Sequence, residues 1–250
     1  MEINGMLFDL GGTLFSYAGQ RQMGHAIFEV AEALGLKEER RKIGAAWHKA
    51  GESVMRDFSQ RDYFLHRDLF VQTLKTFASS FDVPVPEPVA ERFHSSQRAA
   101  VVDHLPIRPD CLETLRTLKT QGVYLAIVSN IDDDYLDPLV EKHGLAEVLD
   151  HWTSSEEAQS CKPHTAIYHY ALKKAGLSSE ETLFVGDSLH HDIAGASAAG
   201  LRSARIIEEG ITTPLTSGLK ITAQPDYEIN ELAQLTGIVE SVKTESHSES

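Results

Sequence analysis

The residues best suited to chemistry stand near the start of the chain, where a carboxylate is followed by a glycine pair. An apolar run over residues 3–8 ends at Asp9, and Gly11 and Gly12 follow one residue later. The run predicts a short buried strand, and the glycines predict a sharp turn with uncovered backbone N–H groups. A carboxylate beside such groups can attack a phosphoryl group whose oxygens bind the turn. The pattern also fits an aspartate that only hydrogen-bonds to its own turn, so this motif alone leaves both interpretations open.

Further polar groups follow later apolar runs. Ser129 and Asn130 end one such run, and their side chains can donate hydrogen bonds to phosphate oxygens, or cap the next helix. Lys162 lies just before a predicted helix, where its ammonium and the helix N–H groups would favour an anion. Asp187 and Asp192 flank a turn after another run, and paired carboxylates suit a hard cation such as Mg²⁺.

The elements that must position these groups alternate between strand and helix in the second half of the chain. Strands are predicted at residues 123–128, 148–149, 182–185 and 202–207, with an edge strand at 223–229. Helices are predicted at residues 109–121, 133–143, 165–175 and 192–199. This alternation predicts an α/β fold, a doubly wound parallel sheet with helices on both faces. The ligand site of such a sheet lies outside the carboxyl ends of its strands.

The segment between the first strand and this alternating region has only helical patterns. Helices are predicted near residues 23–34, 38–58, 63–77 and 88–100. We therefore expect an all-helical domain over residues 16–103, inserted into an α/β core formed by 1–15 and 104–240. The polar residues 241–250 predict a disordered tail.

Composition limits the possible partners and compartments. The 250 residues carry a formal net charge of −14, which argues against nucleic acid, since phosphate backbones need a basic face. No apolar stretch is long enough to span a membrane, and the first residues lack the pattern of a signal peptide. Cys111 and Cys161 are the only cysteines and have no partner motif, so a reduced, cytoplasmic protein is expected.

Taken together and in order, these motifs resemble the haloacid dehalogenase-like hydrolase superfamily, most of whose members are phosphatases. The motifs are Phe8-Asp9-x-x-Gly12-Thr13-Leu14, Ile127-Val128-Ser129-Asn130, Lys162-Pro163 and Gly186-Asp187-Ser188-x-x-x-Asp192-Ile193-x-Gly195-Ala196. The resemblance implies a Rossmann-like core and identifies the helical insert with the family's cap domain. It also implies a small phosphorylated metabolite as substrate and Mg²⁺ as cofactor. The oligomeric state stays open.

The resemblance also implies roles for individual residues. Asp9 would be the nucleophile that forms an aspartyl-phosphate, and Lys162 would complete the catalytic pair. The metal would be held by Asp9, the Gly11 carbonyl oxygen and Asp187, with Asp192 supporting both the metal site and Lys162. The phosphoryl group would be bound, besides by Lys162, by Gly12, Thr13, Ser129 and Asn130.

One position departs from the family's pattern. Family phosphatases usually carry a second aspartate two residues after the nucleophile, which protonates the leaving group and then activates water, and Gly11 stands there. Such groups contribute about 10²–10⁴ in rate, so we expect an impaired or redirected enzyme. His190 or His191 could replace the acid. A Gly11→Asp substitution should be accommodated and should speed the hydrolysis of alkyl phosphates.

Two alternatives to a phosphatase stay open. A 2-haloacid dehalogenase needs the Asp9 nucleophile but neither metal nor acid, although a second carboxylate at Asp187 would repel its carboxylate substrate. The other alternative is a catalytically weak protein that binds a phosphorylated ligand and regulates another process, and Gly11 is its best support.

Overall fold

The computed structural model describes residues 2–19, 25–210 and 223–248, which divide into two compact units. One unit comprises Met1–Tyr17 and Pro106–Ser250, and the other comprises Ala18–Leu105. The expected boundaries lay at residues 16 and 103.

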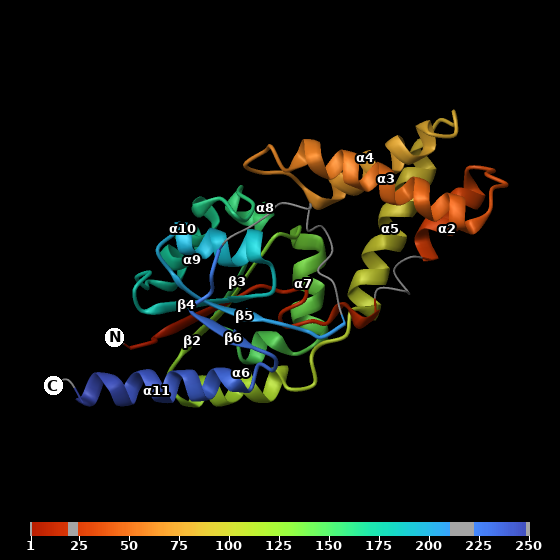
Figure 1. Ribbon diagram of the computed structural model, residues 1–250. Helices are drawn as coiled ribbons and strands as arrows, with labels where there is room; N and C mark the ends of the chain where they lie inside the picture. The colour runs from red at the N-terminus through yellow and green to blue at the C-terminus, as the bar shows by residue number, and fades with distance from the viewer. Residues whose placement is uncertain (1, 20–24, 211–222, 249–250) are drawn as a thin grey trace. The chain divides into compact units, whose positions relative to one another are not determined.

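The larger unit is built on a six-stranded parallel sheet in the order β3-β2-β1-β4-β5-β6 (Figure 1). The strands are β1 (Gly5–Phe8), β2 (Tyr124–Ser129), β3 (His151–Ser154), β4 (Thr182–Gly186), β5 (Arg202–Ile206) and β6 (Tyr227–Ile229). The chain moves outward from β1 in one direction and then in the other, which confirms the doubly wound α/β fold. The strand order reverses at β1, where such sheets bind ligands.

Helices cover both faces of this sheet (Figure 1). Their bounds are α6 (Cys111–Thr120), α7 (Asp133–Lys142), α8 (Ser155–Ala158), α9 (Thr165–Ala175), α10 (Gly195–Ala198) and α11 (Gln234–Ser248). Helices α6 and α11 lie together along one face, while α9 and α10 lie on the other. The core under α9 and α10 is formed by fully buried residues of β1, β2 and β4, namely Leu7, Ala126 and Phe184. Burial on both sides explains why these strands are almost entirely apolar.

Three predictions for this unit need correction. Residues 148–149 are not a strand, because Leu149 N–H bonds to Leu145 O just after the 3₁₀ turn η2 (Leu145–Glu147), and the strand starts later at His151. The helix expected at residues 192–199 begins earlier, as a π-helical turn η3 (Leu189–Ala194) followed by α10. Of the expected disordered tail at 241–250, residues 241–248 are helical, since Leu235, Val239 and Val242 share one buried face, and 249–250 lie outside the described residues.

The described part of the smaller unit, residues 18–19 and 25–105, is all-helical. It consists of α2 (His25–Ala33), α3 (Arg40–Phe58), α4 (His66–Ser79) and α5 (Glu87–His104). Trp47 packs edge-on against Phe77 and Phe93, with ring centroids 5.6 and 5.3 Å apart. These aromatic side chains therefore pack together in the core of the unit.

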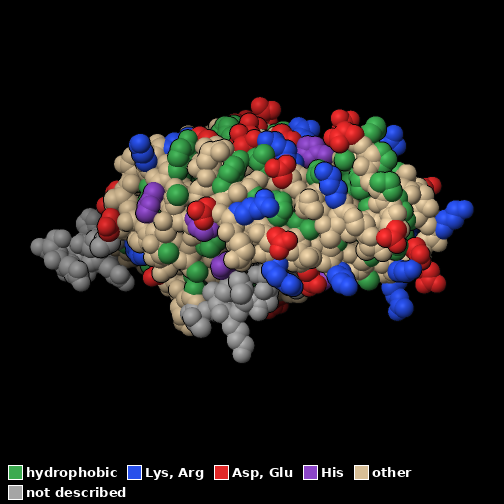
Figure 2. Space-filling view, turned by 90° about the horizontal axis from the view of Figure 1, so that it is seen from above, with side chains coloured by type: hydrophobic (Ala, Val, Ile, Leu, Met, Phe, Trp, Pro, Cys, Tyr) green, Lys and Arg blue, Asp and Glu red, His purple; other side chains and the backbone are tan. Residues whose placement is uncertain are grey.

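On the face seen in Figure 2, acidic and basic side chains are interspersed instead of being separated by sign. Within the described residues, no helix has the length and apolar character needed to cross a membrane.

Strand β3 contains a buried histidine that should make stability depend on pH. His151 is 7% exposed, and its Nδ1 lies 2.9 Å from Tyr124 Oη. Burial, with a further contribution from Lys174, lowers its pKa to about 4, against opposing effects of Glu157 and Asp150. Between pH 6.5 and 4 the unfolded chain therefore binds a proton that the folded chain does not, and the free energy of unfolding falls as pH falls.

We expect this histidine to reduce stability by about 3 kcal/mol at pH 4 relative to pH 7. Urea unfolding at both pH values should show a smaller acid loss for His151→Gln than for the wild type. An identical acid loss in the two proteins would show that His151 is already protonated in the fold.

Candidate active site

Asp9 lies at the carboxyl end of β1, the central strand, and is nearly buried. Its N–H bonds to Val185 O of β4, so the strand pairing fixes the start of the turn. Lys162 Nζ lies 2.5 Å from Asp9 Oδ1, and Ser129 Oγ donates to the same oxygen at 3.1 Å. Thr13 Oγ1 donates to Asp9 Oδ2 at 3.4 Å. The predicted site residues from three separate segments thus meet at one carboxylate.

Lys162 is a buried cation between two carboxylates. Its Nζ also lies 2.6 Å from Asp192 Oδ1, and only 3% of Lys162 is exposed. Burial alone would lower the pKa of Lys162, but the negative charges of Asp192 and Asp9 outweigh it and raise that pKa. Lys162 therefore carries its charge in the fold and holds the two carboxylates together.

Asn130 contacts the backbone of Lys162. Its Nδ2 donates to Lys162 O at 2.9 Å, and its Oδ1 accepts from Lys162 N at 2.7 Å. These two bonds fix the backbone of Lys162 and so position its ammonium beside Asp9. The second N–H of the Asn130 amide can still donate to another acceptor, so its binding of phosphate oxygens stays a prediction. Ser129 does not cap the following helix, because α7 begins at Asp133.

The turn after Asp9 requires glycine at position 12. Gly12 has φ = 83°, and a Cβ there would lie 2.4 Å from Asp187 Oδ2. Both the backbone conformation and the close approach of Asp187 therefore exclude a side chain. Arg108 Nη2 donates to Gly12 O at 2.9 Å and pairs with Glu208 at 3.1 Å, which fixes the turn from outside.

Three carboxylates could hold a metal ion at this turn. One oxygen each from Asp9, Asp187 and Asp192 lies within 4.8 Å of the other two. Oxygen ligands of this kind fit Mg²⁺. Asp192 already uses Oδ1 for Lys162 and Oδ2 for the Ser188 N–H at 2.9 Å. Both Asp9 oxygens also accept hydrogen bonds, from Lys162, Ser129 and Thr13, so these contacts do not rank Asp9 above Asp192 as a ligand.

Burial affects the pKa of the Asp192 carboxyl more than its charged neighbours do. Only 1% of this residue is exposed, and burial raises the pKa of its carboxyl to about 6. Lys162 and the Ser188 N–H act in the opposite direction, and Asp9 adds to the rise. The Lys162 ammonium is thus what keeps two acidic groups compatible in so small a volume.

The space beside Gly11 is filled by Tyr17, a residue that no sequence motif marks as part of a site. A Cβ at Gly11 would lie 2.5 Å from Tyr17 Oη and 3.0 Å from its Cζ. The expectation that Gly11→Asp would be accommodated was therefore wrong for steric reasons, although the Gly11 backbone lies outside the left-handed region. Burial, followed by the charges of Asp9, Asp187 and Asp192, raises the pKa of the Tyr17 phenol well above its usual value.

The two histidines considered as replacement acids lie in η3. Their rings contact each other, with centroids 4.9 Å apart. His191 N–H bonds to Ser188 Oγ at 3.1 Å, and the Tyr168 hydroxyl donates to His191 O. The backbone of His191 therefore helps to hold this turn in place through its bonds to Ser188 and Tyr168.

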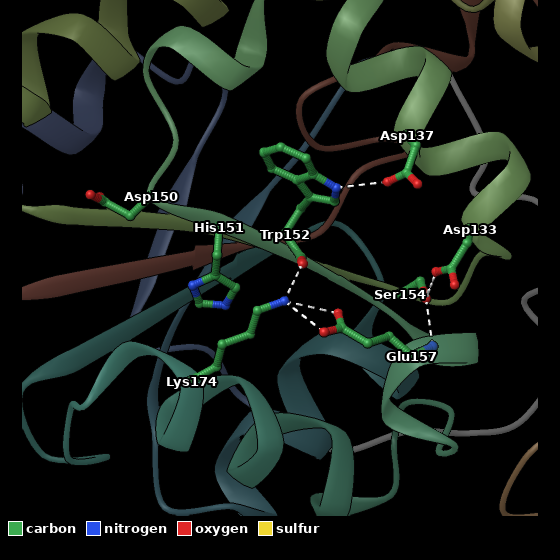
Figure 3. A pocket seen from close by; sticks show the side chains of 8 residues that line it. All are labelled: Asp133, Asp137, Asp150, His151, Trp152, Ser154, Glu157 and Lys174. Carbon is green, nitrogen blue, oxygen red and sulfur yellow. Dashed lines mark hydrogen bonds and ion pairs between the residues drawn. The ribbon is translucent and has the colours of Figure 1, made fainter.

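A separate hollow lies at the edge strand β3 (Figure 3). Its polar side chains largely bond one another: Lys174 Nζ lies 2.7 Å from Glu157 Oε1 and 2.9 Å from Trp152 O, while Trp152 Nε1 donates to Asp137 at 2.8 Å. These paired groups have the arrangement of a surface network, and we assign no ligand to it.

Comparisons with known proteins identify relatives of this chain. A family model described as haloacid dehalogenase-like hydrolase matches residues 3–200. The chain is 30% identical over 239 residues to a ribulose-1,5-bisphosphate 5-phosphatase of Halopiger xanaduensis, covering 94% of this chain and 98% of that protein. It is 26% identical to (S)-2-haloacid dehalogenase 4A of Burkholderia cepacia, over 82% and 83% of the two chains.

A solved structure shows the same fold. The putative hydrolase YfnB of Bacillus subtilis, determined with bound magnesium, superposes with a TM-score of 0.73 at 19% identity, covering 96% of this chain and 99% of that chain. The fold, the family match over most of the chain and the full-length relative agree with the motif order found in the sequence. This chain belongs to the haloacid dehalogenase-like hydrolases.

Proposed function

We propose that the chain is a Mg²⁺-dependent phosphatase that acts on small phosphorylated metabolites through an aspartyl-phosphate on Asp9. The observation that carries this proposal is the position of the Asp9 carboxylate, 2.5 Å from the Lys162 ammonium and within 4.8 Å of Asp187. A nucleophile that attacks a dianion needs positive charge beside it, and a net charge of −14 makes a local source necessary.

The chain's own residues supply most of the required chemistry. Lys162 neutralises charge beside the attacking carboxylate, and its contact with Asn130 keeps it in place. Ser129 and Thr13, which donate to Asp9, can turn the same hydroxyls to phosphoryl oxygens. Of the glycine pair, the Gly12 N–H bonds Phe15 O at 2.6 Å, so the Gly11 N–H is the one left for the remaining oxygen. Together these groups hold the phosphorus in line with Asp9.

The metal would be held by Asp9, Asp187 and the Gly11 carbonyl oxygen. Mg²⁺ bound there supplies positive charge to the phosphoryl oxygens. The choice of hard oxygen ligands supports this cation over a softer metal. The relatives' names support the substrate class, because the Halopiger protein is named for a phosphorylated sugar.

Metal removal is the first test. Hydrolysis of p-nitrophenyl phosphate by the purified protein should require Mg²⁺ and stop in excess EDTA. Asp187→Asn should raise the Mg²⁺ concentration needed for half-maximal activity by at least about tenfold, since a hard cation loses an anionic ligand. Asp137→Asn, an exposed aspartate of α7, is the matched control and should leave the Mg²⁺ requirement unchanged.

Two results would contradict the proposal. Halide release from a 2-haloacid, unaffected by EDTA, would identify a dehalogenase instead. Binding of phosphorylated metabolites without any turnover, with Mg²⁺ present, would identify a ligand-binding protein.

A further inference from the structure

The Gly11-Gly12 turn forms a cradle for the ring of Tyr17. A Cβ at Gly11 would lie 2.5 Å from Tyr17 Oη, and a Cβ at Gly12 would lie 2.8 Å from Tyr17 Cε2. Side chains at either position would therefore displace the ring. The two glycines thus allow the phenol of Tyr17 to lie beside the turn that carries Asp9 and contacts Asp187.

The distance of this hydroxyl from position 11 matches that of an aspartate oxygen there. In an aspartate, each carboxylate oxygen is two bonds from Cβ, at about 2.4 Å. Tyr17 Oη lies 2.5 Å from the position that the Gly11 Cβ would take. The hydroxyl thus lies at the same distance from Cβ as an aspartate oxygen at position 11 would.

We propose that Tyr17 donates a hydrogen bond from its hydroxyl to the leaving-group oxygen of the substrate, in place of the absent side chain at Gly11. The proposal rests on the phosphatase function given above. A phenol is uncharged at neutral pH and donates from its hydroxyl, whereas a fourth carboxylate beside Asp9, Asp187 and Asp192 would add charge repulsion.

The step balances without full proton transfer from Tyr17. An oxygen of Asp9 forms a bond to phosphorus while the bond from phosphorus to the leaving oxygen breaks, and the electron pair stays on that oxygen. The Tyr17 hydroxyl stabilises this charge by its hydrogen bond, and an alkoxide then takes a proton from water. Because an aryl oxide is a stable anion, it needs this help much less.

Tyr17→Phe tests the proposal, because it keeps the ring and removes only the hydroxyl. We expect kcat/KM for an alkyl phosphate such as glycerol phosphate to fall roughly tenfold, the range of one neutral hydrogen bond. For p-nitrophenyl phosphate it should fall less than about threefold. Tyr170→Phe, which removes an exposed hydroxyl that bonds Glu157 at 3.2 Å, should change neither value.

A second pair of variants tests the position independently of the phenylalanine ring. Tyr17→Ala clears the cradle, and Gly11→Asp with Tyr17→Ala adds a carboxylate there. We expect the double variant to recover alkyl-phosphate turnover at least about tenfold over Tyr17→Ala, within the contribution of such acids. This recovery would show that a proton donor is needed at the site that Tyr17 fills.

The outcomes separate this inference from the proposed function. If Tyr17→Phe lowers kcat/KM equally for alkyl and aryl phosphates, or for neither, the proposed role of Tyr17 is wrong. Mg²⁺-dependent turnover by the wild type would still support the phosphatase function in that case. Absence of phosphate release from both substrates by the wild type would overturn the function and the inference with it.

Discussion

We expect the Asp9→Asn variant to lose more than about 10³-fold of its phosphatase turnover while keeping its fold. Asparagine has nearly the same shape as aspartate: its Oδ1 can still accept from Ser129, and its Nδ2 can donate to the Thr13 hydroxyl, which then acts as the acceptor. The amide is a poor nucleophile, however, and cannot form the aspartyl-phosphate. Lys162 keeps its second partner, Asp192, and the buried charge therefore remains paired.

Steady-state hydrolysis of p-nitrophenyl phosphate measures the loss of turnover, and thermal unfolding shows whether the fold is kept. Asp137→Asn is the control for the substitution type, since Asp137 is exposed and bonds to Trp152 outside the site. Residual activity of Asp9→Asn within tenfold of the wild type, about 1.4 kcal/mol, would mean that another group attacks phosphorus.

Replacing Lys162 by methionine should damage both activity and stability. The substitution removes the ammonium that lies 2.5 Å from Asp9 and 2.6 Å from Asp192, and leaves two buried carboxylates facing each other. Loss of one partner from a buried ion pair reduces stability by about 3–5 kcal/mol. The same change removes positive charge beside the attacking group, so we expect turnover to fall by at least about 10².

Lys119→Met is the matched control, because it breaks an ion pair of similar length in an exposed position. Lys119 Nζ lies 2.5 Å from Asp150 Oδ1, and 42% of the lysine side chain is exposed. Its loss should change the free energy of unfolding by less than about 1 kcal/mol and leave turnover unchanged. Similar unfolding midpoints in urea without Mg²⁺ for the two lysine variants would contradict the account of Lys162 as a buried charge.

Several elements were predictable because their signals were local. Helix α9 has the predicted bounds, as the glycine at position 176 ends it in the left-handed conformation, and β4 differs from the prediction by one residue. The convergence of Asp9, Ser129 and Lys162 was also predictable, since residues that follow parallel strands meet at one edge of the sheet.

The remaining features depend on contacts that no local pattern encodes. The Leu145 turn delays β3 until His151, although residues 148–149 are apolar enough for a strand. Asn130 bonds the Lys162 backbone because the two segments happen to lie side by side. Tyr17 was missed since an aromatic residue after a strand has no signature of a site, and its place beside Gly11 depends on how the chain leaves the turn.

The central claim is that Asp9 accepts the phosphoryl group. Its most direct test is mass spectrometry of peptides from protein quenched in acid during turnover of p-nitrophenyl phosphate with Mg²⁺. The account predicts one added phosphoryl group on the peptide that contains Asp9, absent in EDTA and absent in Asp9→Asn. A phosphoryl group found instead on His190 or His191, or phosphate release with Asp9 never modified, would contradict it.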